Sequence, residues 1–592
     1  MIVSNLRKLL LVCFGLASSL TQAASLECGT ESSHVSGCAA GKCPLEGLLH
    51  EEFITDPSLI VDSTTLNTYR VPPVAERALN PDAGDKVIVK SFVVQGVAAN
   101  PEKGISPESV QAMADALYIK AMEGKAEPAL TVGQMVKVSD EITTHYRSSG
   151  YLVAKAFIPV QTVSDDGVVR IQVLEGRVSE IVVEGNNHFD AKNIARPAQP
   201  LVGRIPIREA VETSLLYSLD HPGIRLFGTF RPGEETGDAR LILQVLDEDR
   251  LAFNLGVDNY GIELTGEIRT RVDMAWNDPL GLADRLDVTL LQSINPANTT
   301  YGAVDYRVPV GPRGFGLFIG GGSNEFRIND GPFAAIDLQG TITNYKAGVD
   351  WRFIRSRFFN AQTKLGYTQK QSALDGVGGS LDISNDTTGV VGLEAGFDRL
   401  DTVYRGVDLG FARWRQGVSG EFIGVNANKL QPDFSILDFS YTRVQPIAET
   451  QSLVGRLRVQ KAFDAVSSLE QFSLTGPDAV RAYPVGEALR DSGRFLSIEY
   501  KVQAPGFSAA PGPFSRRWGD LLQFWLFADY AYGEFEGATG ANRAELSGYG
   551  ASVQFAIPGS FQFLMHGAKP LSSLVASDGD DFRIFAEMSY RF

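Results

Sequence analysis

The second half of the chain consists of segments in which apolar and polar residues alternate. In the last segment, Phe582 to Phe592, one face carries Phe, Ile, Ala, Met, Tyr and Phe, and the other carries mainly Arg, Glu and Ser. Successive side chains of a β-strand point to opposite faces. Alternation that continues to the last residue is typical of a strand between lipid and a wet lumen. An edge strand of a soluble sandwich is the alternative interpretation.

The alternating pattern begins at Arg250, where long helical patterns end. Only helices or closed barrels satisfy the backbone hydrogen bonds within lipid, and no run of eighteen apolar residues follows the N-terminus. A spanning strand needs about 10 residues, and its connection needs a similar length. Residues 250–592 therefore predict an all-β barrel of roughly sixteen antiparallel strands.

The first 23 residues form a predicted signal peptide. Arg7 and Lys8 precede an apolar run from Leu9 to Leu20, and Thr21–Ala23 supplies a small-residue cleavage site. The apolar run is too short for a permanent membrane helix. The mature chain is therefore expected to be exported.

Residues 24–85 carry the three cysteines that remain after cleavage, namely Cys28, Cys38 and Cys43. In an oxidising compartment, we expect one local disulfide among them and one thiol left over. Their spacing with His34 matches no zinc pattern, so we expect no metal. The rest of this segment predicts a short amphipathic helix near residues 45–53, followed by a linker rich in proline and glycine.

Between the linker and the barrel, one small α+β unit occurs twice, in residues 86–175 and 176–249. In the first unit we expect strands at 87–94, 152–160 and 168–174, and two helices. Ser106 precedes Pro107 at the start of the first helix, as at many helix N-termini. The second helix carries Met135, Val138, Ile142 and Tyr146 on one face. The second unit repeats this order.

One late segment, Leu469 to Tyr483, is punctuated by glycine and proline and is predicted to be a loop. Its single arginine, Arg481, lies between Val480 and Tyr483. About forty residues later, a predicted strand carries Gln523, Trp525, Phe527 and Asp529 on one face. We expect Arg481 to pair with Asp529 inside the barrel, since arginine can bind a carboxylate with two parallel bonds. Val480 and Tyr483 should then pack on Trp525 and Phe527.

Several separated motifs resemble those of the two-partner secretion transporters, the TpsB family. The segment Val480–Tyr483 resembles the tip of that family's sixth extracellular loop, and Phe527–Ala531 resembles its matching strand motif; Ala482 and Ala531 stand where the motifs have glycine. The other resembling segments are Thr144–Pro159, Gly167–Ile181, His221–Gly233, Asn277–Asp284 and Asp305–Gly311.

The resemblance implies two periplasmic POTRA domains, residues 86–175 and 176–249, that receive an unfolded secreted protein, and an outer-membrane pore that passes it outward. It implies a Gram-negative cell, an N-terminal plug helix about residues 24–85, outer-membrane lipid around the barrel and the barrel-assembly machinery for its insertion. A client can add a strand to a sheet edge, and the segment with Leu152, Ala154, Ala156 and Ile158 is our predicted edge. The client would be an adhesin, haemolysin or toxin.

Two other functions compete with this one: a BamA-like insertase, which usually carries five POTRA domains, and an exported adhesin or hydrolase. No phosphate-binding glycine loop, Gly-x-Ser-x-Gly elbow or His-Glu-x-x-His motif occurs. We therefore expect no enzyme, no catalytic residue and no cofactor. The net charge of −16 argues against nucleic-acid binding.

Overall fold

The computed structural model describes residues 69–74, 84–329, 336–377, 379–424, 430–537, 542–572 and 574–592. The chain separates into two compact units, one at 67–248 and one that contains residues 249–592. The predicted signal peptide, plug helix and three cysteines lie outside the described residues.

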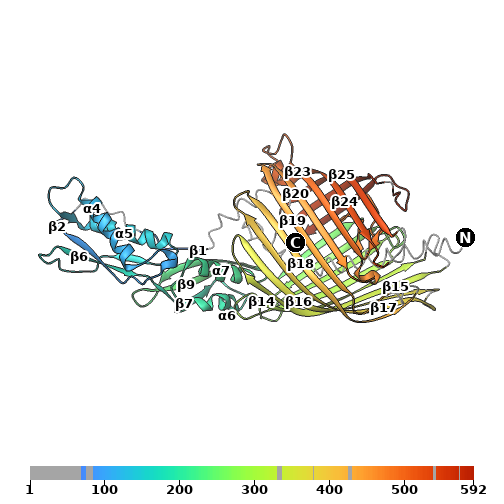
Figure 1. The fold of residues 1–592 in the computed structure, drawn as a ribbon, viewed down its shortest axis with the longest axis horizontal. Helices are drawn as coiled ribbons and strands as arrows, with labels where there is room; N and C mark the ends of the chain where they lie inside the picture. Colours follow the sequence, from blue (N-terminus) through green and yellow to red (C-terminus); the bar gives the residue numbers. More distant parts are fainter. Residues whose placement is uncertain are drawn as a thin grey trace. The chain divides into compact units, whose positions relative to one another are not determined.

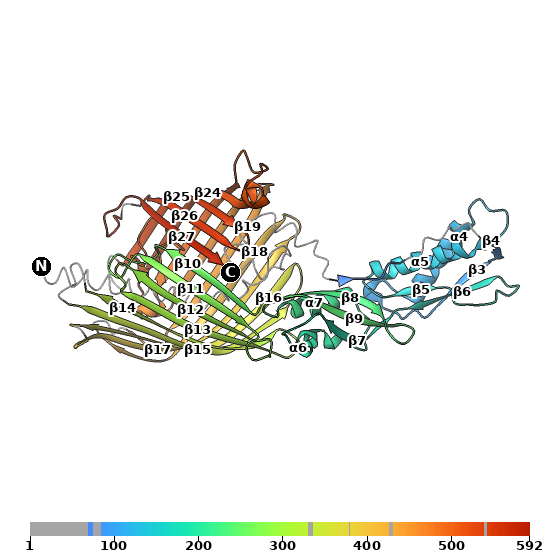
Figure 2. The same ribbon diagram turned by 180° about the vertical axis from the view of Figure 1, so that it is seen from behind.

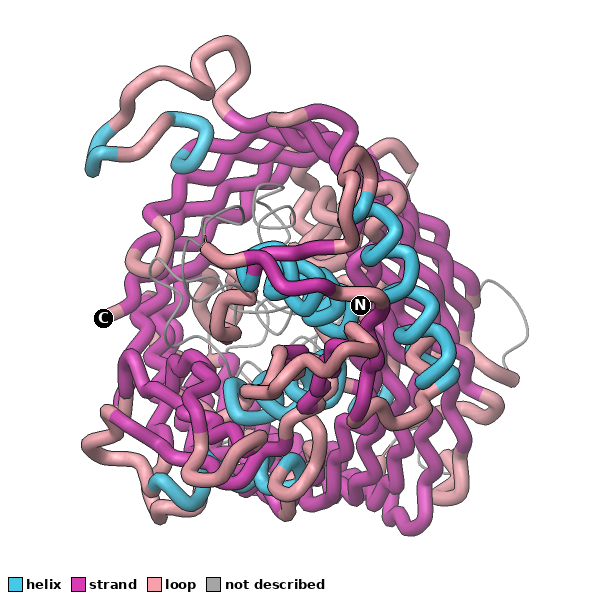
Figure 3. Tube along the Cα trace, turned by 90° about the vertical axis from the view of Figure 1, so that its left-hand side faces the viewer, coloured by secondary structure: helices cyan, strands magenta, loops and turns pink. Residues whose placement is uncertain are grey.

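The second unit is a closed antiparallel barrel in which each strand pairs with the next and the last pairs with the first (Figures 1 and 2). Viewed from one end, the strands form a continuous ring (Figure 3). The described residues give sixteen barrel strands. They are β10 (Leu251–Asp258), β11 (Ile268–Asn277), β12 (Arg285–Ile294), β13 (Thr299–Val310), β14 (Phe315–Ile328), β15 (Leu338–Ile354), β16 (Phe359–Gly376), β17 (Leu381–Asp401), β18 (Gly406–Ile423), β19 (Ser435–Ala448), β20 (Gln451–Ala462), β23 (Ser492–Gln503), β24 (Leu522–Glu534), β25 (Arg543–Ile557), β26 (Phe561–Pro570) and β27 (Arg583–Arg591).

Alternation along each strand separates the two faces of this barrel. On β10, Leu255 and Val257 are exposed on the outer wall, while Asp258 accepts a hydrogen bond from Arg269 on β11 at 2.8 Å. On β24, Phe524 and Leu526 are exposed, whereas their neighbours are buried. An apolar outer wall and a polar or filled interior are what a membrane barrel requires.

The first repeat packs two helices on a small sheet. Its elements are β2 (Lys86–Ile88), β3 (Ser91–Gln95), α4 (Pro107–Met122), β4 (Ala129–Thr131), α5 (Val132–Ser148), β5 (Lys155–Phe157) and β6 (Val168–Leu174). Ser106 caps α4 by accepting a bond from Ser109 N at 3.1 Å. The sheet has the order β3-β6-β5, and β2 pairs with β4 separately.

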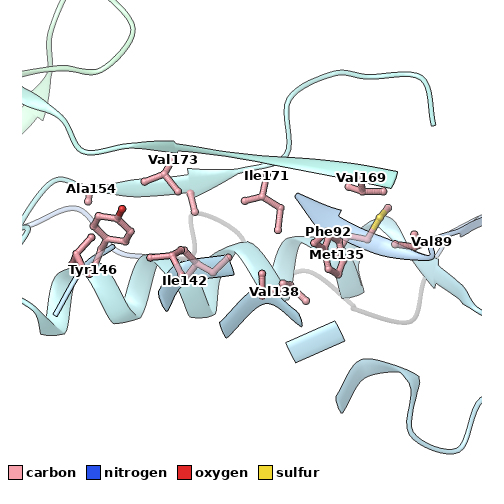
Figure 4. Close-up of a cluster of buried hydrophobic side chains, with 14 of the residues drawn as sticks. Val89, Phe92, Met135, Val138, Ile142, Tyr146, Ala154, Val169, Ile171 and Val173 are labelled. Carbon is pink, nitrogen blue, oxygen red and sulfur yellow. The ribbon is translucent and has the colours of Figure 1, made fainter. Parts of the chain in front are cut away.

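The core of this repeat lies between α5 and the sheet (Figure 4). Met135, Val138, Ile142 and Tyr146 of α5 are all buried there, as the spacing predicts. They face the apolar residues of β3 and β6, which include Phe92 and Ile171 (Figure 4). Removing these side chains from water is what stabilises the domain.

The second repeat contains β7 (Arg177–Glu184), α6 (Ala191–Ala195), a 3₁₀ helix at Arg196–Leu201, α7 (Arg208–Leu219), β8 (Ile224–Pro232) and β9 (Asp238–Glu248). Its four-stranded sheet has the order β1-β8-β9-β7. One of these four strands, β1 (Tyr69–Arg70), comes from the segment that we expected to be a linker. It pairs with Gly228 and Thr229 of β8, so this part of the linker is a strand of the second repeat.

Two of the strands expected in the first repeat are shorter or divided. The run 87–94 forms β2 and β3 rather than one strand. The run 152–160 contains only β5, because Leu152 lies in a turn and its N–H binds Pro206 O at 3.2 Å. Among the described residues, no helix has the length and apolar content needed to cross a bilayer.

Candidate functional site

A long connection between β20 and β23 folds into the barrel. We call residues 463–491 the inward loop. It contains a 3₁₀ turn at Ser468–Glu470 and two short paired strands, β21 (Phe472–Ser473) and β22 (Leu489–Arg490). Almost all of its residues from Val466 to Ser473 and from Ala479 to Tyr483 are buried. A connecting loop normally lies on the surface, so this burial marks the inward loop as part of the barrel interior.

Arg481 at the tip of the inward loop binds Asp529 on β24 through two side-chain bonds. Its Nε lies 2.9 Å from Oδ2 and its Nη2 lies 2.8 Å from Oδ1. The Arg481 backbone N–H donates to the same Oδ2 at 3.2 Å. The two side chains are 4% and 0% exposed. The pairing expected from the sequence is therefore present, and it is buried.

Two residues of β23 complete the surroundings of Arg481. Nη1 donates to Glu499 Oε1 at 2.8 Å, and Nη2 donates to Ser497 Oγ at 3.0 Å. Ser497 in turn donates to Asp529 Oδ1 at 2.7 Å. The guanidinium carbon lies 3.5 Å from the centre of the Phe527 ring. A buried guanidinium needs partners of this kind, because removing a charge from water without them is costly.

Glu499 and Ser497 were not among the residues singled out from the sequence. The alternation along β23 contains the signal that could have found them: Glu499 and Lys501 fall on one face of a strand whose other face carries Leu496 and Ile498. Both charged residues are buried, and Lys501 lies 3.3 Å from Glu499. Charged residues on a barrel's inner face indicate a lumenal network.

The loop tip also has an apolar seat. Val480 and Tyr483 belong to one buried cluster with Trp525 and Phe527 of β24, which is the packing expected from the sequence. The Tyr483 hydroxyl lies 2.6 Å from Ser572 Oγ and donates to Leu574 O at 3.1 Å. Both partner residues precede β27. The tip is thus fixed by charge, by packing and by hydrogen bonds.

Ala482 takes the place of a glycine in the resembling motif, and the structure accommodates its methyl group. Ala482 is not among the residues with a positive φ, so its backbone conformation does not demand glycine. Opposite it lies Gly548 on β25, where an added Cβ would fall 2.6 Å from the Ala482 Cβ. Gly548 therefore leaves the space that the Ala482 methyl group occupies.

The four residues expected to bind a client lie in the domain cores. Ala154 and Ala156 are buried in the first repeat, Ile158 packs partly buried on the same core, and Leu152 belongs to the core of the second repeat. The main chain of Ala156 is also occupied, since its N–H donates to Thr143 Oγ1 at 2.9 Å. A client strand that paired with this edge would have to replace the Thr143 hydroxyl as the partner of the Ala156 main chain.

Comparison with known proteins agrees with this architecture. The family model "Haemolysin secretion/activation protein ShlB/FhaC/HecB" matches residues 237–554, and the model "POTRA domain, ShlB-type" matches residues 103–176. The chain belongs to the ShlB/FhaC/HecB family of two-partner secretion transporters. It is therefore an outer-membrane β-barrel transporter of partner exoproteins with periplasmic POTRA domains, and not an enzyme.

Individual relatives are distant in sequence. The heme/hemopexin transporter protein HuxB of Haemophilus influenzae (strain 86-028NP) is 25% identical over 474 residues, which cover 75% of this chain and 79% of HuxB. The hemolysin transporter protein ShlB of Serratia marcescens is 24% identical over 425 residues, 68% and 72% of the two chains. The structure of CdiB from Escherichia coli shares the fold, with a TM-score of 0.61 and 17% identity over 90% of this chain and 98% of CdiB.

Proposed function

We propose that this ShlB/FhaC/HecB family protein carries one unfolded partner exoprotein through its barrel to the cell surface, and that the ion pair of Arg481 with Asp529 holds the inward loop in the position that this transport requires. The client first meets the POTRA domains in the periplasm. The observation that carries the proposal is the buried bidentate pair between the loop tip and the barrel wall.

Burial makes the ion pair of Arg481 with Asp529 costly to break. Removing one partner of a buried ion pair typically costs about 3–5 kcal/mol, because the other charge is left uncompensated. Each 1.4 kcal/mol corresponds to about a tenfold change in an equilibrium constant. The free-energy cost of losing Arg481 is therefore large enough to move the tip of the inward loop out of its position. It changes no contact between neighbouring barrel strands, so the barrel itself should persist.

Transport needs no nucleotide in this proposal. The chain carries none of the phosphate-binding motifs described above, and folding of the client outside the cell would draw the chain outward. The relatives support the client class, since one is a heme/hemopexin transporter protein and another is a hemolysin transporter protein. For this chain we propose a large exported protein of the adhesin, haemolysin or toxin type.

Two further partners belong to the same proposal. Outer-membrane lipid would surround the apolar wall of the barrel, where side chains such as Leu255, Leu526 and Tyr590 are exposed. The cell's barrel-assembly machinery would insert the protein. The predicted plug helix near residues 45–53 lies outside the described residues, and its role remains a prediction.

The test is secretion of the client by cells that carry Arg481→Ala. We expect secretion to fall at least tenfold, with unchanged amounts of barrel in the outer membrane and unchanged heat-modifiable migration. Arg327→Ala is the matched control, because Arg327 also binds an aspartate through two bonds but is half exposed. Normal secretion by the Arg481 variant would refute the role of the pair.

A further inference from the structure

The inward loop makes a second buried ionic contact, which lies nearer its start. Glu470 ends the 3₁₀ turn of the loop, and its side chain is 0% exposed. Its Oε1 lies 3.0 Å from Lys370 Nζ on β16, and its Oε2 accepts a bond from Arg415 on β18. Lys370 Nζ also donates to Leu469 O at 3.3 Å. One loop carboxylate is therefore held by two cations of the barrel wall.

Residues of neighbouring barrel strands hold Arg415 in the orientation that binds Glu470. Arg415 donates from Nε to Asp438 Oδ2 at 2.7 Å and from Nη2 to Asp438 Oδ1 at 2.9 Å. Arg413 also binds Asp438, at 3.0 Å. The guanidinium of Arg415 is thus oriented by β19 and presents its Nη1 to Glu470. Such preorganisation lowers the cost of forming a charged bond.

Gln460 on β20 binds both ends of the inward loop and also binds Arg415 of the barrel wall. It accepts a bond from Arg415 Nη2 at 2.9 Å, and its Nε2 donates to Glu470 O at 2.7 Å and to Asp491 O at 2.9 Å. Glu470 lies near the beginning of the loop and Asp491 at its end. The contact therefore fastens the neck of the loop, whereas Arg481 fastens its tip.

The two contacts lie at different depths. Gln460 is two residues from the end of β20 at Ala462. Arg456, which lies 3.8 Å from Glu499 beside the tip, is four residues earlier on the same strand. A strand rises about 3.3 Å per residue, so the neck contact lies about 13 Å closer to the strand end where the loop leaves the wall.

The charges at the two contacts are reversed. At the tip, a loop cation binds two acids of the wall, Asp529 and Glu499, and Glu499 also has Arg456 and Lys501 beside it. At the neck, a loop anion enters a part of the wall that carries Lys370, Arg413 and Arg415 around one acid, Asp438. A loop that slipped along the barrel would separate both loop charges from their partners at the same time, so two contacts of opposite sign at fixed spacing define one position of the loop.

We propose that Glu470 is a second, independent positioning residue, which anchors the neck of the inward loop to Lys370 and Arg415 and completes the charge balance of the lumen at that level. This inference rests on the proposed role of the inward loop in transport. It assigns release of the loop to two separate events: the tip leaves when Arg481 leaves Asp529, and the whole loop leaves only when Glu470 also leaves the wall.

Ion conduction through the full-length protein in planar bilayers tests this proposal without a client. We would compare Glu470→Gln, Lys370→Gln, Arg481→Gln and the double variant of Glu470 and Arg481. Each single change should raise the mean resting conductance, by about twofold or more. The double variant should exceed the sum of the two single increases, because either anchor alone still restrains the loop.

The reversal potential under a salt gradient separates anchoring from a general loss of structure. Glu470→Gln removes an anion from a cationic wall, so the pore should become more selective for anions. Lys370→Gln loosens the same contact but removes a cation, so the shift should be toward cations, with a similar rise in conductance. A disturbed barrel would shift the reversal potential in the same direction in both variants.

Asp408→Asn is the matched control. Asp408 is a buried barrel carboxylate that accepts bonds from Tyr441 and Arg443, both on β19. The Asp408→Asn change should leave the resting conductance unchanged. The proposal is overturned if Glu470→Gln and Lys370→Gln conduct like the parent protein, or if the double variant equals Arg481→Gln. Since no client is present, these outcomes are independent of whether Arg481→Ala affects secretion.

Discussion

Two arginine–aspartate pairs of this barrel have nearly the same geometry and very different surroundings. Arg481 binds Asp529 at 2.9 and 2.8 Å, and Arg327 binds Asp337 at 2.7 and 2.6 Å. The first pair is 4% and 0% exposed, whereas the second is 49% and 25% exposed. Bond lengths therefore do not distinguish them, and burial does.

The difference shows why position decides what an ion pair contributes. Water and salt screen the exposed pair, and each of its partners is solvated when the other is removed. At the buried pair, loss of Arg481 removes the cation that binds Asp529 through two bonds, and the carboxylate stays buried. The same kind of ion pair therefore anchors the loop at Arg481 and contributes little to stability at Arg327.

The largest effect should come from Asp529→Ala. It removes both carboxylate oxygens of Asp529 that bind the Arg481 side chain and leaves the buried guanidinium with only Glu499 and Ser497 of its four side-chain contacts. Removal of one partner of a buried ion pair typically costs about 3–5 kcal/mol. We expect the tip of the inward loop to leave its position and to become accessible to proteinase K added to intact cells. Cleavage within residues 463–491, mapped by mass spectrometry, measures this. A loop that stays protected would show that packing alone holds the tip.

Gly548→Ala should have the next largest effect. Its new Cβ would fall 2.6 Å from the Ala482 Cβ, and overpacking of this kind costs about 1–3 kcal/mol. Adding Ala482→Gly to the same protein should restore protease protection, since it removes the clashing methyl group. Gly455→Ala is the control, because an added Cβ there meets nothing within 4 Å. Failure of the double variant to recover would contradict the assigned contact.

Tyr483→Phe should have a smaller effect. It keeps the buried ring but removes the bonds to Ser572 and Leu574, and a hydrogen bond contributes about 0.5–1.5 kcal/mol. Slightly faster cleavage of the inward loop is expected, with secretion close to normal. An effect as large as that of Asp529→Ala would place the main anchor at the hydroxyl group instead of the ion pair.

The smallest effect should come from Asp337→Asn at the exposed pair. Solvent can replace the lost charge interaction with Arg327, so secretion, conductance and protease protection should equal those of the parent protein. The same measurements on Asp529→Asn make the comparison direct, because both changes preserve the shape of the side chain. Equal behaviour of the two variants would break the argument from burial.

Much of this architecture could be predicted from local patterns. The face of α5 with Met135 and Tyr146 is buried because helical spacing places its residues on one side. The inner face of β24, from Gln523 to Asp529, is buried because alternation does the same for a strand. Residues 69–70 show the limit of this approach: their strand exists only because β8 is beside them.

The partners of the buried charges could be predicted only where a motif linked them. Arg481 and Asp529 were linked by a resemblance across 48 positions of the chain. Glu470 had no such link, and its partners Lys370 and Arg415 lie on strands far away in the sequence. Pairing between distant residues depends on strand register and loop path, which no single segment contains.

The sequence by itself determined that the second half of the chain forms strands with an apolar and a polar face, since alternation is a local property of the backbone. The sequence also predicted that Arg481 of a loop would pair with Asp529 of a strand. Only the tertiary structure decided that the inward loop is held by two contacts at different levels of the barrel wall. It also decided that Gly548 leaves space for the Ala482 methyl group, and that the main chain of Ala156 binds Thr143. These outcomes depend on closure of the barrel and on packing between distant elements, where burial turns weak local preferences into a single arrangement.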